Sequence, residues 1–311
     1  MNLLIKKFLF GLGMLLPVLV HAQDVDLSKL LDDQSKKEIK ETTEKVYSTF
    51  KSTRLISGHS VENTWKGVLD VRISHRFGTV NKGAYEFFGL DNATMRLGFD
   101  YGITNRLMVG VGRSTFQKQF DGFFKYKILW QSRGKHNVPV TANFVSSIML
   151  QTLKADVSQT PYYFSSRLAY AQQLIIGRKF SESISLQLMP TWIHYNLVPK
   201  IADPNDLFAI GIGGRQKLSK HISINAEYYY QLPGYKFSDT KNALSVGFDL
   251  ETGGHVFQLH FTNANGMTER SYITETKGSW GKGDILFGFT ISRVFTVKKS
   301  KTDKALTKDL K

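Results

Sequence analysis

Residues 94–116 contain the sequence feature that most restricts the fold of this chain. From Met95 to Ile103, apolar residues occupy every second position, and small or charged residues occupy the positions between them. After Thr104-Asn105, the same alternation resumes from Leu107 to Val111. A period of two residues is typical of a β-strand, and a short reversal between two such strands predicts a β-hairpin.

The second face of this hairpin is polar but poor in the residues that normally cover a sheet in water. It carries Arg96, Gly98, Asp100 and Gly102 on the first strand and mostly glycine on the second. A sheet whose apolar face meets lipid and whose small, polar face lines a closed interior shows this pattern. The fold class that we predict is therefore an all-β, antiparallel, up-and-down transmembrane β-barrel.

The first 22 residues have the layout of a secretory signal peptide. Lys6 and Lys7 precede the apolar run Phe8–Val20, and Val20-His21-Ala22 is suited to cleavage before Gln23. The run is shorter than the roughly 20 residues of a membrane-spanning helix. The chain contains no cysteine, so neither disulfides nor thiolate metal ligands hold it together. We expect export to the cell outer membrane.

Four regions follow from composition and pattern. We expect a signal peptide at 1–22, a charged periplasmic arm or lumen segment at 23–64, the barrel at 65–297 and a basic periplasmic tail at 298–311. The formal net charge of +15 is spread mostly over loops and the tail. For an exported protein this charge favours outer-membrane lipid headgroups as partners and argues against nucleic acid.

The barrel region is predicted to contain about twelve strands, an even number as in bacterial single-chain barrels. Their connections alternate between long and short, except for the short link at 117–119, and this alternation predicts tight periplasmic turns and longer outer loops. The predicted strands are Trp65–Phe77, Ala93–Ile103, Arg106–Phe116, Phe120–Gln131, Asn137–Thr152, Tyr163–Phe180, Ser183–Asn196, Leu207–Leu218, His221–Gln231, Asn242–Thr252, His255–Asn263 and Gly283–Val297.

Two details of these strands are open to test. Trp130, Tyr163, Trp192 and Tyr195 lie toward strand ends, where an aromatic girdle would meet the lipid headgroups. In the predicted strand Tyr163–Phe180, Gln172 falls on the apolar face, so either a bulge shifts the register or the strand begins later.

Three stretches, together with a closing strand, resemble a known family. They are FKSTRLISGHSVE at 50–62, VRISHRFG at 71–78, GGHVFQLHFTNANGMTE at 253–269 and the strand GDILFGFTISRVF at 283–295. The chain resembles the outer-membrane β-barrels called domain of unknown function 5777, over most of residues 50–295. The resemblance implies fold and compartment, and it carries no established activity or functional residue.

Charged residues on the predicted lumen face are the candidate functional residues. Six are basic and four are acidic, which would make an open pore mildly favourable to anions. Alternatively, they pair across the interior and fill it. They are Asp70, Arg72, Arg76, Arg96, Asp100, Lys125, Lys127, Arg167, Glu227 and Asp249.

These observations predict passive passage or binding of small polar solutes, anions among them, with no catalysis and no cofactor or metal. A structural barrel with a filled lumen is the alternative. A lipid or ester hydrolase at the rim is a second alternative, for which the lumen-facing His260 would be the general base.

Overall fold

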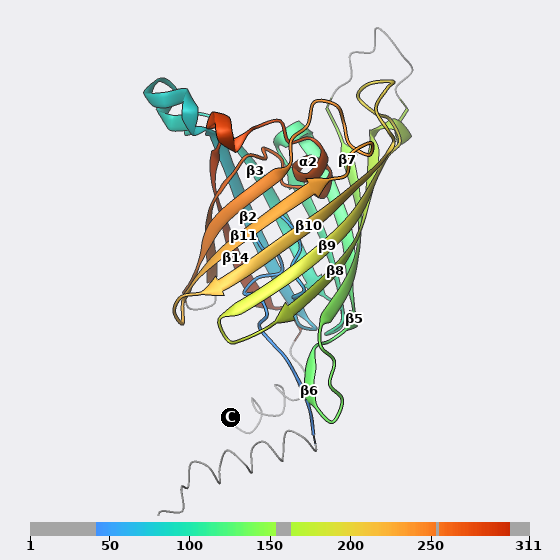
Figure 1. Ribbon diagram of the computed structural model, residues 1–311, viewed down its shortest axis with the longest axis vertical. Coiled ribbons are helices and arrows are strands. Elements are labelled where there is room, and N and C mark those ends of the chain that lie inside the picture. Colours follow the sequence, from blue (N-terminus) through green and yellow to red (C-terminus); the bar gives the residue numbers. More distant parts are fainter. Residues whose placement is uncertain (1–41, 154–162, 253–254, 299–311) are drawn as a thin grey trace, which may run out of the picture.

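Twelve antiparallel strands form a closed barrel in the computed structural model, which describes residues 42–153, 163–252 and 255–298 (Figure 1). The predicted signal peptide, and all of the predicted tail except Lys298, lie outside these residues. The barrel strands are β2 (Val68–Thr79), β3 (Ala93–Gly102), β4 (Leu107–Ser114), β5 (Gln119–Leu129), β7 (Thr141–Gln151), β8 (Leu168–Lys179), β9 (Ile184–Tyr195), β10 (Asp206–Lys217), β11 (Ile222–Gln231), β12 (Ala243–Thr252), β13 (His255–Thr262) and β14 (Leu286–Thr296).

The barrel closes where the last strand pairs with the first. In β14 and β2, Leu286 lies opposite Thr79 and Thr296 lies opposite Val68. Each of the other strands pairs with its neighbours in the chain, apart from a short excursion between β5 and β7. Closure removes the free sheet edges, so every strand has its hydrogen-bond partners within the bilayer. The predicted fold class is thus confirmed.

The two faces of the wall have opposite chemistry, as the alternation predicts. Leu97, Ile224 and Phe287 lie on the outer face and do not converge on a shared apolar centre. Their sequence neighbours Arg96, Ser223 and Gly288 point inward and are buried. The outer face is therefore an apolar band of the kind that contacts lipid.

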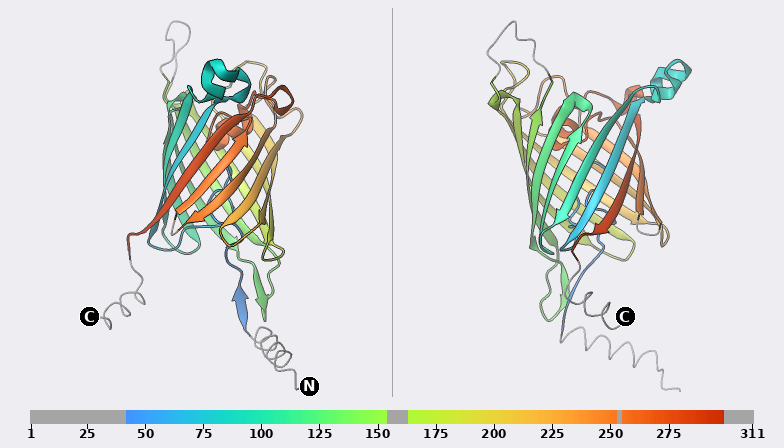
Figure 2. Two further views of the ribbon diagram at one scale, coloured as in Figure 1. Left: turned by 90° about the vertical axis from the view of Figure 1, so that its left-hand side faces the viewer. Right: turned by 180° about the vertical axis from the view of Figure 1, so that it is seen from behind.

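The two ends of the barrel differ in the length of their connections. The turn end carries the links after β3, β8, β10 and β12 and the β5–β7 excursion, whereas the loop end carries the other connections. The interior-directed chain before β2 and the end of β14 both lie at the turn end (Figure 2). The alternation of long and short connections is present, with the short η2 (Phe116–Lys118) as its exception.

Short elements extend beyond the wall at both ends. At the turn end, β1 (Thr43–Lys45) pairs with β6 (Ser132–Gly134) in a two-stranded projection. At the loop end, η1 (Val80–Gly89) projects away from the wall (Figure 2). The other loop-end elements are η3 (Ser165–Arg167), α2 (Glu269–Thr274) and η4 (Trp280–Lys282).

The structure settles one open prediction, at Gln172, and corrects another, at Tyr195. β8 begins at Leu168, and its pairing with β7 and β9 shows no register shift, so Gln172 lies on the outer face in an ordinary strand. Tyr195 was expected in the aromatic girdle, but its ring points inward and is 1% exposed. Its hydroxyl contacts Thr274 of α2, which explains the difference because a phenol can satisfy its O–H in a polar interior.

No helix within the described ranges is long and apolar enough to span a bilayer.

Candidate functional site

The chain just before β2 enters the barrel and fills its interior. We call residues 49–64 the interior segment; its trace is visible inside the wall in Figure 1. It enters from the turn end, reverses where the Leu55 N–H donates to the Gly58 carbonyl at 2.8 Å, and returns to the same end. The Ser60 N–H donates to the Thr53 carbonyl at 3.0 Å across this hairpin. Because both ends of the segment are at one mouth, it is a re-entrant plug and not a thread through the pore.

Glu227 of β11 holds the tip of the plug. Its carboxylate accepts the N–H groups of Ile56, Ser57 and Gly58 at 3.3, 2.7 and 3.1 Å. Gly58 is required here by space, since an added β-carbon would overlap the hydroxyl of Tyr229. One side chain of the wall therefore satisfies three backbone donors that belong to no helix or sheet.

Other wall side chains bind the carbonyl oxygens of the interior segment. The Lys125 ammonium donates to the carbonyls of Thr53, Ser60 and Glu62 at 3.2, 3.1 and 2.5 Å. Three side-chain amides donate to further carbonyls at 2.8–3.0 Å: Asn143 to Val61, Gln187 to His59 and Gln258 to Leu55. The polar lumen face thus supplies the hydrogen bonds that an irregular buried segment needs.

The connection between β13 and β14 fills the interior from the loop end. Its helix α2 is buried, with Tyr272 and Ile273 at 1% and 0% exposure. Glu269 of α2 meets the plug, because the Arg54 guanidinium donates to its carboxylate at 2.8 Å and His59 Nε2 lies 3.2 Å from the same oxygen. The plug and the outer loop are therefore joined directly at the centre of the barrel.

Electrostatics favours this contact, and neither partner lies on a membrane-spanning strand. Burial alone would raise the pKa of Glu269, but the charge of Arg54 and the neighbouring His59 lower it below its ordinary value. Burial, reinforced by Arg54, lowers the pKa of His59 to about 3. At neutral pH, an ionised Glu269 thus pairs with Arg54 beside a neutral His59.

Nine of the ten charged residues proposed from sequence point into the barrel and are at most 4% exposed. Arg72 donates to Asp70 at 3.0 Å, and Asp100 accepts the Thr53 hydroxyl at 3.2 Å. Arg167 differs because it lies in η3 at the rim, outside the strand that was predicted for it. The nine inward residues are Asp70, Arg72, Arg76, Arg96, Asp100, Lys125, Lys127, Glu227 and Asp249.

The sequence reasoning missed several residues of the same interior. Asp121, which binds Arg96 with both oxygens, lies on the same face of β5 as Lys125, so the two-residue period was a sufficient signal. Arg54, His59 and Glu269 lie outside the strands, and no periodicity marks them. Only the three-dimensional path of the two loops brings these residues together.

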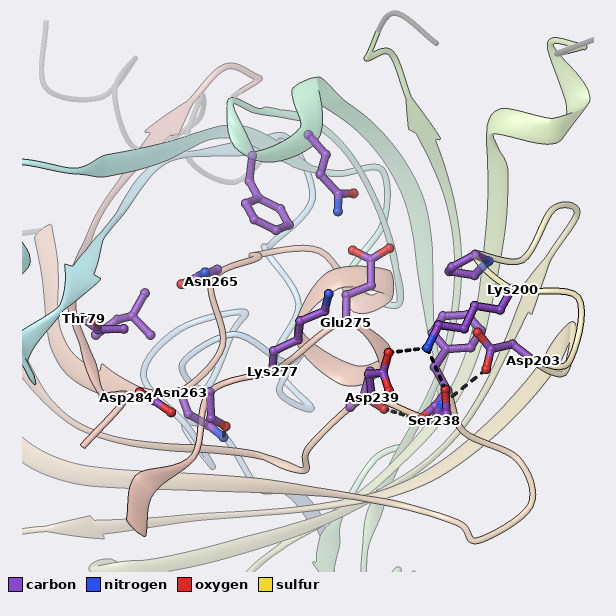
Figure 3. A pocket seen from close by; sticks show the side chains of 17 residues that line it. Thr79, Lys200, Asp203, Ser238, Asp239, Asn263, Asn265, Glu275, Lys277 and Asp284 are labelled. Atoms are coloured by element: carbon purple, nitrogen blue, oxygen red, sulfur yellow. Dashed lines mark hydrogen bonds and ion pairs between the residues drawn. The ribbon is translucent and has the colours of Figure 1, made fainter. Parts of the chain in front are cut away.

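A cavity of about 550 Å³ opens between the loops at the loop end (Figure 3). Phe116, Phe237, Pro199 and Leu286 contribute apolar surface, and the charged groups of its lining include four carboxylates and two ammonium groups. Volume and convergent polar groups are those of a small-molecule site. The charged lining residues are Asp203, Asp239, Glu275, Asp284, Lys200 and Lys277.

Pairing keeps several of these lining groups charged. Lys200 hydrogen-bonds Asp239, which lowers the pKa of the acid and raises that of the lysine. The Ser279 N–H, followed by the Asn81 amide, lowers the pKa of Asp284. With more carboxylates than ammonium groups, the cavity gives no advantage to an anionic solute.

A second cavity of about 360 Å³ lies at the turn end, beside the entry of the interior segment. Its lining includes Phe50, Lys51 and Thr53 of the segment and Asp70 of the wall. Lys51 forms an ion pair there with Glu251 of β12. The plug therefore separates two cavities at opposite ends.

His260, the candidate base of a hydrolase, points inward and is 2% exposed. Neither ring nitrogen has a hydrogen-bond partner among the described residues, so the structure does not pair it with a serine or an acid. No group of three or more potential metal ligands occurs within those residues.

Comparison with known proteins identifies the family of this chain. No curated protein matches the chain. Among solved structures, the NanC porin is 9% identical with a TM-score of 0.47, over 73% of this chain and 98% of that one. The COG4313 outer membrane channel from Pseudomonas putida F1 is 13% identical with a TM-score of 0.45, over 76% and 98%. A family model described as a membrane bound beta barrel domain (DUF5777) matches residues 50–295. The chain belongs to this family of membrane-bound β-barrels.

Proposed function

We propose that the protein is an outer-membrane barrel that binds a small polar solute at its loop end and controls its passage by moving the interior segment. The observation that carries this proposal is a seal made largely of hydrogen bonds between two cavities of about 550 and 360 Å³ at opposite ends. In the described conformation, the seal closes the path between them.

The path of the interior segment suits a part that moves. It enters and leaves at the turn end, so it can withdraw without passing its ends through the barrel. It forms no regular helix or strand, and many of its wall contacts are hydrogen bonds that water can replace, beside the apolar contacts of Leu55 and Val61.

The loop-end cavity favours a neutral solute with hydroxyl groups and an apolar face. Hydroxyl groups can bond to its carboxylates, amides and lysines, and the apolar face can pack on Phe116 and Phe237. The excess of carboxylates argues against selection of anions there. The predicted anion preference therefore does not extend to this cavity.

A removable disulfide tests the movement. An ideal β-carbon at Gly177 lies 2.6 and 3.2 Å from the two γ-carbons of Val61. The Val61 β-carbon is one bond further away, which brings the two β-carbons within reach of the roughly 3.5–4.5 Å that a disulfide requires. The pair Val61→Cys/Gly177→Cys would tie the segment to β8. The chain has no other cysteine, so the single variants are matched controls.

Single-channel recording in planar bilayers gives the readout. We expect current steps from the wild type and the single variants, none from the oxidised pair, and recovery of the steps after reduction. A variant with residues 50–63 replaced by a glycine-serine chain of equal length should conduct persistently. Steps that continue unchanged in the oxidised pair would refute control by the segment.

A structural barrel with a permanently filled lumen is the second candidate. The observation that favours it is the number of buried wall side chains, Glu227 and Lys125 foremost, that bind the plug. It predicts that the wild type and the reduced pair both lack current steps, because neither can vacate the lumen. It also predicts no uptake of glucose in a liposome-swelling assay with either of them.

A further inference from the structure

A small cavity lined mostly by buried residues lies where the interior segment meets β2, β3, β13 and β14. Its volume is about 20 Å³, enough for a single water-sized particle. Four guanidinium groups line it, and no carboxylate does so among the described residues. The four are Arg54 of the segment, Arg72 and Arg76 of β2, and Arg96 of β3.

Three guanidinium nitrogens of these residues have no partner in the part of the chain that the structure describes. They are Nε and Nη1 of Arg72 and Nε of Arg76, and both side chains are only 2% exposed. The remaining nitrogens fix the two groups in place. The oxygens of Ser52, Thr53 and Asp70 share the two N–H bonds of Arg72 Nη2 at 2.8–3.0 Å. Arg76 donates to Ser57 and to two carbonyls of the β13–β14 connection. Buried donors of this kind require an acceptor.

The chemistry of the lining selects the occupant. A water molecule must donate two hydrogens as well as accept, whereas the unpartnered groups of this lining are mainly donors: three guanidinium nitrogens and one nitrogen of the His260 ring, against one accepting ring nitrogen. The hydroxyls of Thr290 and Ser74 bond each other at 3.0 Å. A monatomic anion accepts from every donor. It also adds a negative charge beside Arg76, which has no ion-pair partner among the described residues, whereas Arg54, Arg72 and Arg96 pair with Glu269, Asp70 and Asp121.

We propose that this cavity binds one chloride ion, held between Arg72 and Arg76 beneath the plug. The site does not depend on the proposed passage of solutes. Because Arg54 and Ser57 of the interior segment complete the cavity, the bound ion stabilises the seated position of the segment.

Bromide provides a direct test on the unmodified protein. Crystals grown with sodium bromide in place of chloride, and measured at the bromine absorption edge, should give an anomalous peak within roughly 3.5 Å of Arg72 Nη1 and Arg76 Nε. Density in the cavity without anomalous signal would mean that water fills it, and this would overturn the proposal. An empty cavity would overturn it as well.

A solution experiment tests the linkage. In detergent at constant ionic strength, the unfolding temperature should rise as chloride replaces gluconate. Gluconate is too large for the cavity, so only chloride can bind and stabilise the folded form. Arg72→Gln should abolish the rise, and Arg133→Gln, at the exposed position of β6, should keep it. If the unfolding temperature of the wild type were the same in chloride and in gluconate, the proposed site would be refuted. If Arg72→Gln does not fold, the bromide experiment decides whether the cavity binds a halide.

Discussion

Glu227 offers the sharpest test of how the plug is held. Its two oxygens accept three backbone N–H groups at the tip of the interior segment, and the side chain is 2% exposed. Glu227→Gln keeps the shape of the side chain but replaces one acceptor oxygen with an NH₂ donor. We expect the seated position of the segment to lose stability while the barrel remains folded.

The magnitude follows from the number of bonds affected. If the amide replaces Oε1, the Ser57 N–H loses its acceptor, and if it replaces Oε2, both Ile56 and Gly58 lose theirs. A hydrogen bond to a charged group contributes about 1.5–3 kcal/mol, and the bonds that remain become neutral. The total loss is about 2–4 kcal/mol, which corresponds to a roughly 30- to 900-fold larger population of the displaced state.

A single cysteine can measure this population, because the chain has none of its own. Ile56→Cys places a thiol on the tip, where the side chain is 6% exposed in the seated state. A maleimide reagent then reacts at a rate proportional to the displaced fraction when reseating is fast. The matched control is Glu251→Gln on β12, which removes a partly exposed ion pair to Lys51 worth about 0–1 kcal/mol.

We expect the labelling rate to rise roughly 30- to 900-fold with Glu227→Gln and less than about sixfold with Glu251→Gln. Both variants should keep the folded mobility of the barrel on gels run without heating. If the two variants changed the rate equally, or if Glu227→Gln changed it less than about threefold, the three hydrogen bonds would not be what seats the plug.

Three further predictions use the same logic. His59 is neutral when seated, with its pKa lowered to about 3, and takes up a proton near pH 6.5 when displaced, so the seated state loses stability as pH falls below about 6.5. Because maleimide reacts with the thiolate, each labelling rate is divided by the rate of free cysteine with the same reagent at the same pH. This ratio should be up to roughly 100-fold higher at pH 4.5 than at pH 7.5, and a pH-independent ratio would contradict the prediction. Gly58→Ala, which forces a methyl group onto Tyr229, should destabilise seating by about 1–3 kcal/mol in the labelling assay, whereas Gly281→Ala, with no atom nearer than 3.9 Å, should leave the rate unchanged. Leu97→Arg, in the middle of β3 on the outer wall, should cost about 2–4 kcal/mol in urea unfolding from lipid vesicles, and a cost below about 0.5 kcal/mol would show that lipid does not contact this face.

The local sequence pattern is sufficient to predict which side chains face outward and inward in most of the barrel wall. Each strand obeys a two-residue period because one face meets lipid and the other the interior, so Leu97 outside and Arg96 inside are readable from their neighbours. The same period is sufficient to place Glu227 and Lys125 in the lumen. The predicted inward position of Arg167 is wrong. The predicted strand began at Tyr163 and so included the η3 turn, whereas β8 begins at Leu168.

The sequence by itself determined a closed antiparallel barrel with short connections at one end, because alternation and turn spacing are local properties of the chain. Tertiary structure alone decided that the lumen is filled. The plug has no periodicity of its own, and its position results from hydrogen bonds between residues far apart in sequence, such as Arg54 with Glu269 and Ser57 with Glu227. Such pairs exist only after the barrel has closed around the segment, so no local pattern can encode them.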